Sequence, residues 1–358
     1  MTKSSKTNSY YKSLMNKKKL ILLITSVLLL IGAAFAYNTY TKIYAPNTIK
    51  EGVIFIKTNS TLKELENEIR PFLKQVESFT WVANQKKYNK TIRPGKFKIP
   101  IGISNNDLIN LLRSGKQTPV KLVFNNQHSI EKLAGRVAIQ IEADSISILN
   151  AMLASSFLNT HKFSKKTALG MYVPNSYEFF WNTSAIQFRD RMLKEYHRFW
   201  TEKRINKARK LKLTRTQVIA LASIVQKETA KVSERPIVAG LYLNRIKRRI
   251  PLGADPTIIY ALKEKYGQDF VVKRVLYKDL KIDSPYNTYI HKGVPPSLIA
   301  MPDISSIDAV LFSTNHSYIF MCANVDKPGY HAFAATLRQH NKNAAKYHRW
   351  MNQQGVNR

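Results

Sequence analysis

One glutamate in this sequence stands where acid–base chemistry would need it, at the end of an apolar helical face. The run from Thr214 to Ala230, TRTQVIALASIVQKETA, predicts a helix, because Thr214 and Gln217 have the spacing of a capping box. At 3.6 residues per turn, Glu228 falls on the same face as the apolar side chains of this run. Those side chains are Val218, Leu221, Ile224 and Val225.

Burial on such a face would change what Glu228 can do. A carboxyl group that loses water has a raised pKa, so it can stay protonated near neutral pH and act as a general acid. Lys227 points to the opposite side of the helix. The structural alternative is that Glu228 is solvated or ion-paired, since perturbed carboxylates also occur in structural pairs.

Few other chemistries fit the sequence. It contains no phosphate-binding or dinucleotide-binding glycine motif, no H-E-x-x-H and no G-x-S-x-G. The single cysteine, Cys322, excludes an internal disulfide and a thiolate zinc cluster, and we expect neither metal nor cofactor. Ordinary polar roles are expected for His316 and His340, whereas His331 remains a candidate for substrate binding.

Two irregular stretches could bring further polar groups to Glu228. The Pro- and Gly-containing run 251–257 delivers Asp255, although the following Pro256 and Thr257 suggest a structural cap. The stretch SPYNTYIHKGVPPSLIAMPD, residues 284–303, is a long loop of the kind that usually serves function. Its polar side chains are Tyr286, Asn287, Thr288 and Tyr289.

The 358 residues are enough for two or three domains. With 57 Lys and Arg against 23 Asp and Glu, the net charge is +34, which favours polyanionic surroundings. The basic residues are spread along the whole chain, so a nucleic-acid-binding face is not expected.

The N-terminal part predicts a membrane anchor. A basic tail, 1–19, ends in three lysines and precedes an uncharged run, 20–36, which is at the short end of what spans a bilayer. The lysines predict a cytoplasmic N-terminus and an outward-facing bulk. A cleaved signal peptide is the alternative, since Ala34-Phe35-Ala36 resembles a cleavage site.

After a linker, 37–49, residues 50–117 predict a small β/α module. A strand starting at Gly52 is followed by a helix capped at Ser60, a second strand at 97–103, and a helix from Ser104 to Gly115. The module lacks an acid on an apolar face, so spacing or binding is expected of it rather than cleavage.

Residues 118–184 predict a connecting subdomain with a strand at 119–124 and helices at 129–140 and 145–155. Its aromatic segment, 170–184, reads as too polar for a core strand; stacking on sugar rings and plugging a domain junction stay open as interpretations. A catalytic domain, 185–358, then begins with one long basic helix to Leu211. It continues with a helix capped at Ser233, a strand at 317–323 and a terminal helix.

Five sequence blocks occur in the order seen in the endolytic murein transglycosylases of the MltG (YceG-like) family. They are LASIVQKETA, ERPIVAGLYLNRI, ADPTIIYAL, SPYNTYIHKGVPPSLIAMP and YHAFAATLRQHN. The region before them also resembles the family, with one N-terminal anchor and a LysM-like module at about residues 50–117. The resemblance implies an α+β fold: one transmembrane helix, a LysM-like β/α module, and a mixed α+β catalytic domain around a central helix.

The resemblance also implies an activity and a site. The activity is cleavage of peptidoglycan glycan strands between N-acetylmuramic acid and N-acetylglucosamine, outside the cytoplasmic membrane and alongside peptidoglycan synthases. The catalytic acid falls on Glu228, while Asn287, Tyr289, Asp255 and Asn244 match positions that line or support the site. A protonated Glu228 would give its proton to the glycosidic oxygen and then accept one from the C6 hydroxyl, leaving a 1,6-anhydro end. Asn287 and Tyr289 could hold the acetamido group or stabilise the transition state.

This chain departs from the family pattern at three places. Gln226 stands where many relatives have Glu, which leaves Glu228 as the only acid in its motif. Ser297 and Asp303 replace family glycines in the loop expected near the sugar. The functional alternative to the enzyme is an inactive, membrane-anchored peptidoglycan-binding scaffold.

Overall fold

The computed structural model describes residues 4–354. The chain forms two compact units, each with its own internal packing. Unit 1 runs to Val120 and also includes Phe180–Asn182, and unit 2 contains the residues from Lys121 onward except that short segment. Small two-stranded sheets among many helices give a mixed α+β fold, as the sequence predicts.

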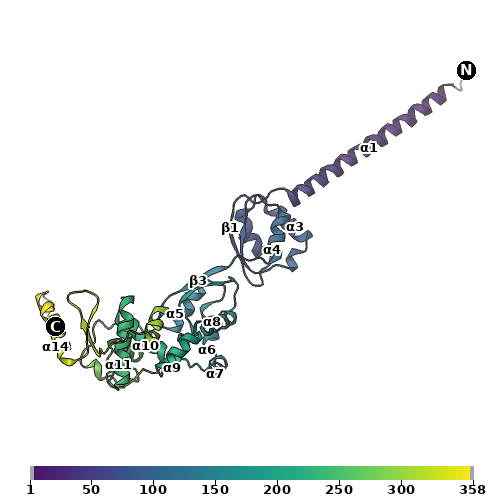
Figure 1. Cartoon of the computed structure of the whole chain (residues 1–358). Helices are drawn as coiled ribbons and strands as arrows, with labels where there is room; N and C mark the ends of the chain where they lie inside the picture. Colours follow the sequence, from purple (N-terminus) through teal and green to yellow (C-terminus); the bar gives the residue numbers. More distant parts are fainter. Residues whose placement is uncertain (1–3, 355–358) are drawn as a thin grey trace. The chain divides into compact units, whose positions relative to one another are not determined.

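The N-terminal helix α1, purple in Figure 1, runs without a break from Ser4 to Tyr44. Its section Leu14–Tyr44 has a mean hydropathy of 2.5 in its most apolar window and is long enough to cross a membrane. The helix therefore extends through much of the predicted tail and into the predicted linker, and residues 1–3 of that tail lie outside the described part. Pro46 accounts for its end, since proline disfavours helical backbone in the residue before it.

The end of α1 is fastened to unit 1 by buried amides. Asn105 donates a hydrogen bond from its Nδ2 to the carbonyl of Lys42 at 2.8 Å. Asn47, just beyond the helix, donates to Oδ1 of Asn105 at 2.7 Å and to the carbonyl of Gln75 at 2.9 Å. Buried amides are costly unless bonded, so this network fixes where the helix joins the unit.

Unit 1 is a two-stranded sheet covered by helices. Strand β1 (Gly52–Ile56) pairs antiparallel with β2 (Gly95–Ile99), with Ile54 opposite Phe97. The remaining elements are α2 (Leu62–Ile69), η1 (Arg70–Phe72), α3 (Val76–Gln85), η2 (Tyr88–Lys90) and α4 (Asn105–Ser114). One hydrophobic core joins them, and its fully buried side chains include Ile69, Phe79, Phe97, Ile99 and Leu108.

The helix caps of unit 1 agree with the sequence prediction at α4 and differ from it by one residue at α2. Ser104 and Gly115 bound α4 as predicted. The predicted cap at Ser60 is wrong by one residue, because Thr61 caps α2 and forms a full capping box with Glu64. Thr61 has the three-residue spacing to Glu64 that the box requires. The second strand begins at Gly95 rather than at residue 97 and ends at Ile99.

The first part of unit 2 contains a second two-stranded sheet, β3 (Val120–Phe124) with β4 (Asn175–Phe179). Residues 170–184, which the sequence suggests are too polar for a core strand, contain the half-exposed strand β4. Its buried residues alternate with exposed ones, and Tyr177 stacks on Phe124 at 5.7 Å between ring centroids. The helices of this part are α5 (Ile130–Ala138), α6 (Ser145–Leu153) and α7 (Ser155–Thr160), followed by η3 (Ala168–Met171).

The predicted long helix 185–211 is two helices, α8 (Ala185–Phe199) and α9 (Glu202–Lys210). Thr201 takes an extended conformation between them, and its side chain accepts a hydrogen bond from the backbone of Arg204. A Thr that caps a new helix offers the backbone an alternative to continuing the old one.

The rest of unit 2 is built around α10 (Arg215–Glu228), which packs against α9, α11, α12 and α13. Every residue from Val218 to Val225 is buried. The surrounding elements are η4 (Val232–Glu234), α11 (Arg235–Lys247), α12 (Asp255–Tyr266), η5 (Asp279–Lys281) and α13 (Ile304–Leu311). At the C-terminal end, β5 (Phe320–Ala323) pairs with β6 (His331–Ala334), and α14 spans Leu337–Gln353.

The predicted cap at Ser233 is not used. Ser233 lies inside η4, and α11 starts after Glu234 with Pro236 in its first turn. Proline suits that position, because its fixed φ angle matches a helix and its missing N–H would be unpaired there anyway.

Candidate active site

Helix α10 carries Glu228 as its last residue. The predicted capping box is confirmed, since Thr214 accepts from the backbone of Gln217 and Gln217 returns a bond to the backbone of Thr214. Ile224 and Val225 have no exposed surface, so the turn before Glu228 is fixed in the core. Glu228 itself is half-buried, with its carboxylate delivered at the edge of the packed helices.

The phenol of Tyr242, on α11, donates a hydrogen bond to Oε1 of Glu228 at 2.7 Å. Among the described residues, no group bonds Oε2 of Glu228, so that oxygen carries the proton when the acid is neutral. Burial is the largest influence on this acid and raises its pKa to about 7. The bond from Tyr242 and the charges of His331 and Arg245 act against that rise, and Asp255 adds to it.

Tyr242 and Arg245 are site residues that the sequence reading missed. Tyr242 is 1% exposed, and burial, followed by the nearby Glu228, raises its pKa so that it remains a donor. Arg245, one turn later on α11, donates to the carbonyls of Ile319 and Leu252. The signal was a Tyr and an Arg three residues apart in a predicted helix, a spacing that places both on one face.

Asp255 begins α12 without capping it, so the expectation of a structural cap is wrong. It accepts a hydrogen bond from the phenol of Tyr289, while its own side chain remains exposed. Burial, then this bond to Asp255, raises the pKa of Tyr289. The charge of Asp255 also raises the pKa of Glu228.

Thr288 ties the two loops of the site together. It has 2% of its surface exposed, and its Oγ1 accepts from the backbone of Ala254 at 3.0 Å and lies 2.8 Å from Oγ1 of Thr257. Its carbonyl also accepts from the backbone of Gly253 at 2.9 Å. These bonds set where Asp255 and Tyr289 lie, and they favour a positioning role for Thr288.

Asn287 is fully buried, and its side-chain amide forms hydrogen bonds to the backbone of its own chain. It donates to the carbonyls of Leu280 and Ile282, both at 2.9 Å, and accepts from the backbone of Tyr289 at 3.0 Å. Tyr286 is also buried and lies 2.7 Å from Oγ of Ser297. This geometry favours loop positioning by both residues, and the sugar contact expected of Asn287 stays a prediction.

Asn244 and His331 support the site from the C-terminal side of unit 2. Asn244 donates from Nδ2 to the carbonyls of His316 and Tyr318, at 2.8 and 3.0 Å. His331 is bonded through its backbone and its Nδ1 to buried Glu234, at 2.6 and 2.9 Å. His331 lies near enough to Glu228 for its charge to lower the pKa of that acid.

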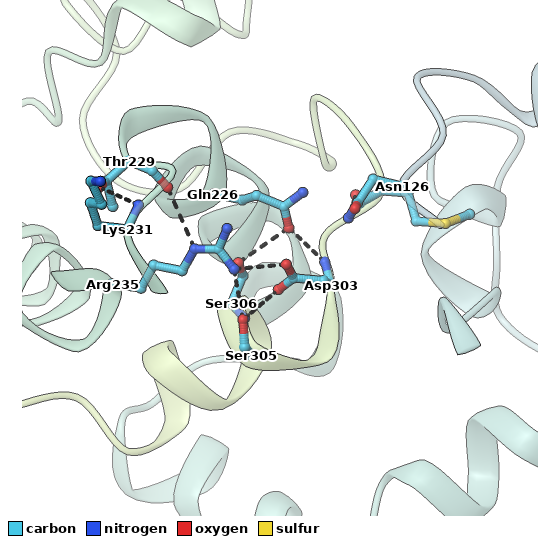
Figure 2. A network of polar contacts seen from close by, with 9 residues as sticks. Asn126, Gln226, Thr229, Lys231, Arg235, Asp303, Ser305 and Ser306 are labelled. Carbon is cyan, nitrogen blue, oxygen red and sulfur yellow. Dashed lines mark hydrogen bonds and ion pairs between the residues drawn. The ribbon is translucent and has the colours of Figure 1, made fainter. Parts of the chain in front are cut away.

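Two departures from the family pattern meet in one polar network, drawn in Figure 2. Gln226 accepts from the backbone of Asp303 at 2.6 Å and from Ser306 at 3.2 Å. Asp303 caps α13 and forms an ion pair with the buried Arg235 at 2.7 Å. Arg235 also donates to Ser305 at 2.6 Å. The network joins α10, α11 and the start of α13, so these departures hold the loop that ends at Asp303.

Within residues 4–354, no group of three or more His, Cys, Asp and Glu side chains is arranged to hold a metal ion.

Comparison with known proteins gives one family and three informative relatives. The YceG-like family model matches residues 54–346. An endolytic murein transglycosylase of Bacillus subtilis is 37% identical over 139 residues, which are 39% of this chain and 36% of that protein. An endolytic murein transglycosylase of Streptococcus pneumoniae is 25% identical over 91% of this chain and 64% of its own length. The chain thus spans less than two thirds of each of these two proteins.

A crystal structure of a YceG-like protein from Listeria monocytogenes matches with a TM-score of 0.53 and 23% identity. The match covers 82% of this chain and 98% of that one. This likeness concerns the fold.

Proposed function

We propose that this chain, which belongs to the YceG-like family, cleaves glycan strands of peptidoglycan as an endolytic lytic transglycosylase. The relatives named endolytic murein transglycosylases support the reaction class. The site supports it independently, since it offers one acid suited to donate and then accept a proton.

The observation that carries the proposal is the state of Glu228. Its pKa of about 7 keeps a large protonated fraction at neutral pH. The bond from Tyr242 occupies Oε1 and leaves Oε2 to face a substrate. A general acid whose pKa lies near the working pH gives proton transfer in both directions at little cost.

The reaction uses these two states in turn. Neutral Glu228 donates its proton to the bridging oxygen as the bond from C1 of N-acetylmuramic acid to that oxygen breaks. The resulting carboxylate takes the proton of the C6 hydroxyl, and that oxygen forms the new bond to C1. Glu228 is again protonated, the product is a 1,6-anhydro end, and no water is consumed.

The neighbours of Glu228 have distinct proposed roles. Tyr242 holds the carboxylate in place and stabilises its charged state between the two steps. Arg245 adds positive charge near the same group. Tyr289 and Asp255 present the most accessible polar pair, and we assign them the contacts to the sugar.

Mass spectrometry of digested sacculi tests the reaction. The expected chain ends are lighter than hydrolytic ends by one water, about 18 Da, because the C6 hydroxyl replaces water as nucleophile. Reducing, hydrolytic ends would contradict the transglycosylase mechanism, and intact strands would favour a binding scaffold instead.

We propose that unit 1 holds the glycan without cutting it. This unit contains residues 50–117, which the sequence predicts to be a LysM-like module. Supporting this, a recess of about 400 Å³ on the unit is lined by Trp81 together with Glu66, Arg70, Glu77 and Asn84. An aromatic ring beside polar and amide groups is a surface on which a sugar can stack and bond.

Helix α1 is proposed to anchor the chain in the cytoplasmic membrane with the N-terminus inside and unit 2 outside. The lysines before its apolar section support this orientation. An outward-facing enzyme tethered at the membrane would meet strands as they are made, so peptidoglycan synthases are the proposed partners.

A further inference from the structure

A cavity of about 220 Å³ lies in unit 2 and is lined in part by residues of α10 and α12. Its polar wall includes three basic side chains, His128, Lys227 and Lys263, and no Asp or Glu is among the described residues that line it. Its apolar wall includes Pro256, Ile259 and Ile299. Cavities that combine an apolar wall with a few charged groups are typical of ligand sites.

The cavity is next to the proposed catalytic centre in the chain. Lys227 immediately precedes Glu228, and Pro256 immediately follows Asp255. A further hollow of about 360 Å³ shares His128 and Ile299 with it. That hollow is lined by Lys165 and Lys166 and by two acids, Glu131 and Glu264, so basic residues without acids line only the first cavity of the two.

The basic groups of the cavity repel one another. Burial, and then the charge of Lys263, lowers the pKa of Lys227. Burial, and then Lys227 and Lys263, lowers the pKa of His128. In the part of the chain that the structure describes, no carboxylate forms an ion pair with either lysine. A bound anion would supply the missing countercharge.

We propose that this cavity binds a carboxylate of the peptide stem carried by the muramoyl residue at the cleaved bond. The inference rests on the proposed function and names which part of the strand the cavity takes. The sugar rings of the strand are uncharged, and its carboxylates belong to the stems. The methyl groups of the stem's alanines match the apolar wall.

The first test compares two substrates with the full-length protein: glycan strands that carry stems, and the same strands after an amidase has removed the stems. The amidase leaves a short lactyl carboxylate on each muramoyl ring, so the comparison separates the stem's carboxylates from this one. The wild type is expected to cleave the stemmed strands with the higher kcat/KM. Lys227→Gln combined with Lys263→Gln should lower that preference by roughly fivefold, mainly through KM, as expected for two partly exposed ion pairs. High salt should lower it as well, because it screens such pairs.

Two control variants separate charge from structure. Lys210→Gln, an exposed lysine on α9, should leave the preference unchanged. Arg at both cavity positions should retain it. Neither lysine is among the charges that shift the pKa of Glu228, so the pH profile should not move in the double variant. An unchanged preference in the double variant, or an equal loss on both substrates, would overturn the inference.

The second test does not need cleavage. A free stem tetrapeptide titrated into the Glu228→Gln chain should shift the NMR signals of cavity residues, and its C-terminal amide should bind more weakly. No shift at saturating peptide would overturn the inference. Peptide binding with no cleavage by the wild type would count against the proposed function alone.

Discussion

At the scale of single residues, the two oxygens of the Glu228 carboxyl group differ in their surroundings. Oε1 of Glu228 accepts a hydrogen bond from Tyr242, and Oε2 is proposed to face the substrate. Burial raises the pKa of Glu228 to about 7, so both protonation states are accessible at neutral pH. Helix α10 positions Glu228, and the hydrogen bond from Tyr242 lowers the pKa that burial has raised.

Replacing Glu228 with Gln should abolish cleavage without harming the fold. Gln cannot donate a proton to the leaving oxygen or accept one later, and general acid–base catalysis is worth roughly two to four orders of magnitude. Because the folded state raises the pKa of Glu228, ionising it costs stability as pH rises from the unfolded value towards 7. The variant should therefore be at least as stable as the wild type at pH above 7. The turnover of purified strands and a thermal melt measure both effects; near-normal turnover would move the search to Asp255.

Replacing Tyr242 with Phe should shift the pH dependence of kcat/KM upward. The hydrogen bond from Tyr242 lowers the pKa of Glu228, so its removal raises that pKa and keeps the acid protonated to higher pH. The alkaline limb of the profile should move to higher pH while the maximum rate falls, since the carboxylate is less well stabilised between the two steps. An unmoved alkaline limb would mean that another group controls it.

At the scale of elements, the site is held by contacts between helices and loops far apart in the chain. Thr288 bonds the turn before α12, and Asp303 joins the start of α13 to α10 and α11. Each contact is a buried or half-buried hydrogen bond, which costs more to leave unmade than it contributes when formed. These contacts explain how a loop without helix or strand can hold a fixed shape.

Replacing Asp303 with Asn should destabilise the protein by about 1–3 kcal/mol, because the buried Arg235 loses its countercharge. Asn keeps the acceptor that caps α13. Burial alone would raise the pKa of Asp303, but bonds from Arg235, Ser306 and Ser305 together lower it. The difference in unfolding free energy between wild type and variant should therefore be constant from neutral pH down to pH 5. It should shrink below 3.8, the pKa of this group in the unfolded chain. Chemical denaturation at several pH values measures it, and an advantage that grew in acid would refute this account.

At the scale of the whole molecule, the chain combines an apolar helix, a small unit that is proposed to hold glycan, and a larger unit that carries Glu228. The high positive charge is consistent with work near anionic polymers. The two units have separate cores, so their contributions can be tested apart.

Removing unit 1 while keeping unit 2 should weaken binding to long strands and leave some turnover of short soluble ones. The acid and all its bonded neighbours lie in unit 2. Co-sedimentation with sacculi and turnover of short strands separate the two effects. Cleavage by residues 1–180 alone would show that the acid has been misplaced.

Protease added to intact spheroplasts should digest unit 2 and spare the segment before α1's apolar section. The lysines at residues 17–19 predict this orientation by the positive-inside rule. Protection of unit 2 would overturn both the orientation and the access to peptidoglycan.

The sequence by itself determined the features that depend on neighbours along the chain. The helix of Glu228, its capping box, the apolar N-terminal segment and the loop after Ser284 could all be predicted, since capping and periodicity are local. Local signals also misled where a cap could form at either of two adjacent residues, as at Ser60 and Thr61, or where a Thr broke a helix.

Only the tertiary structure decided which side chains meet. It paired Tyr242 with Glu228 across fourteen residues, and it buried the amide of Asn287 in hydrogen bonds within its own loop. It also made a strand of β4 by giving Tyr177 a partner in β3. A buried donor or ring is defined by what covers it, and the residues that cover it come from distant parts of the chain.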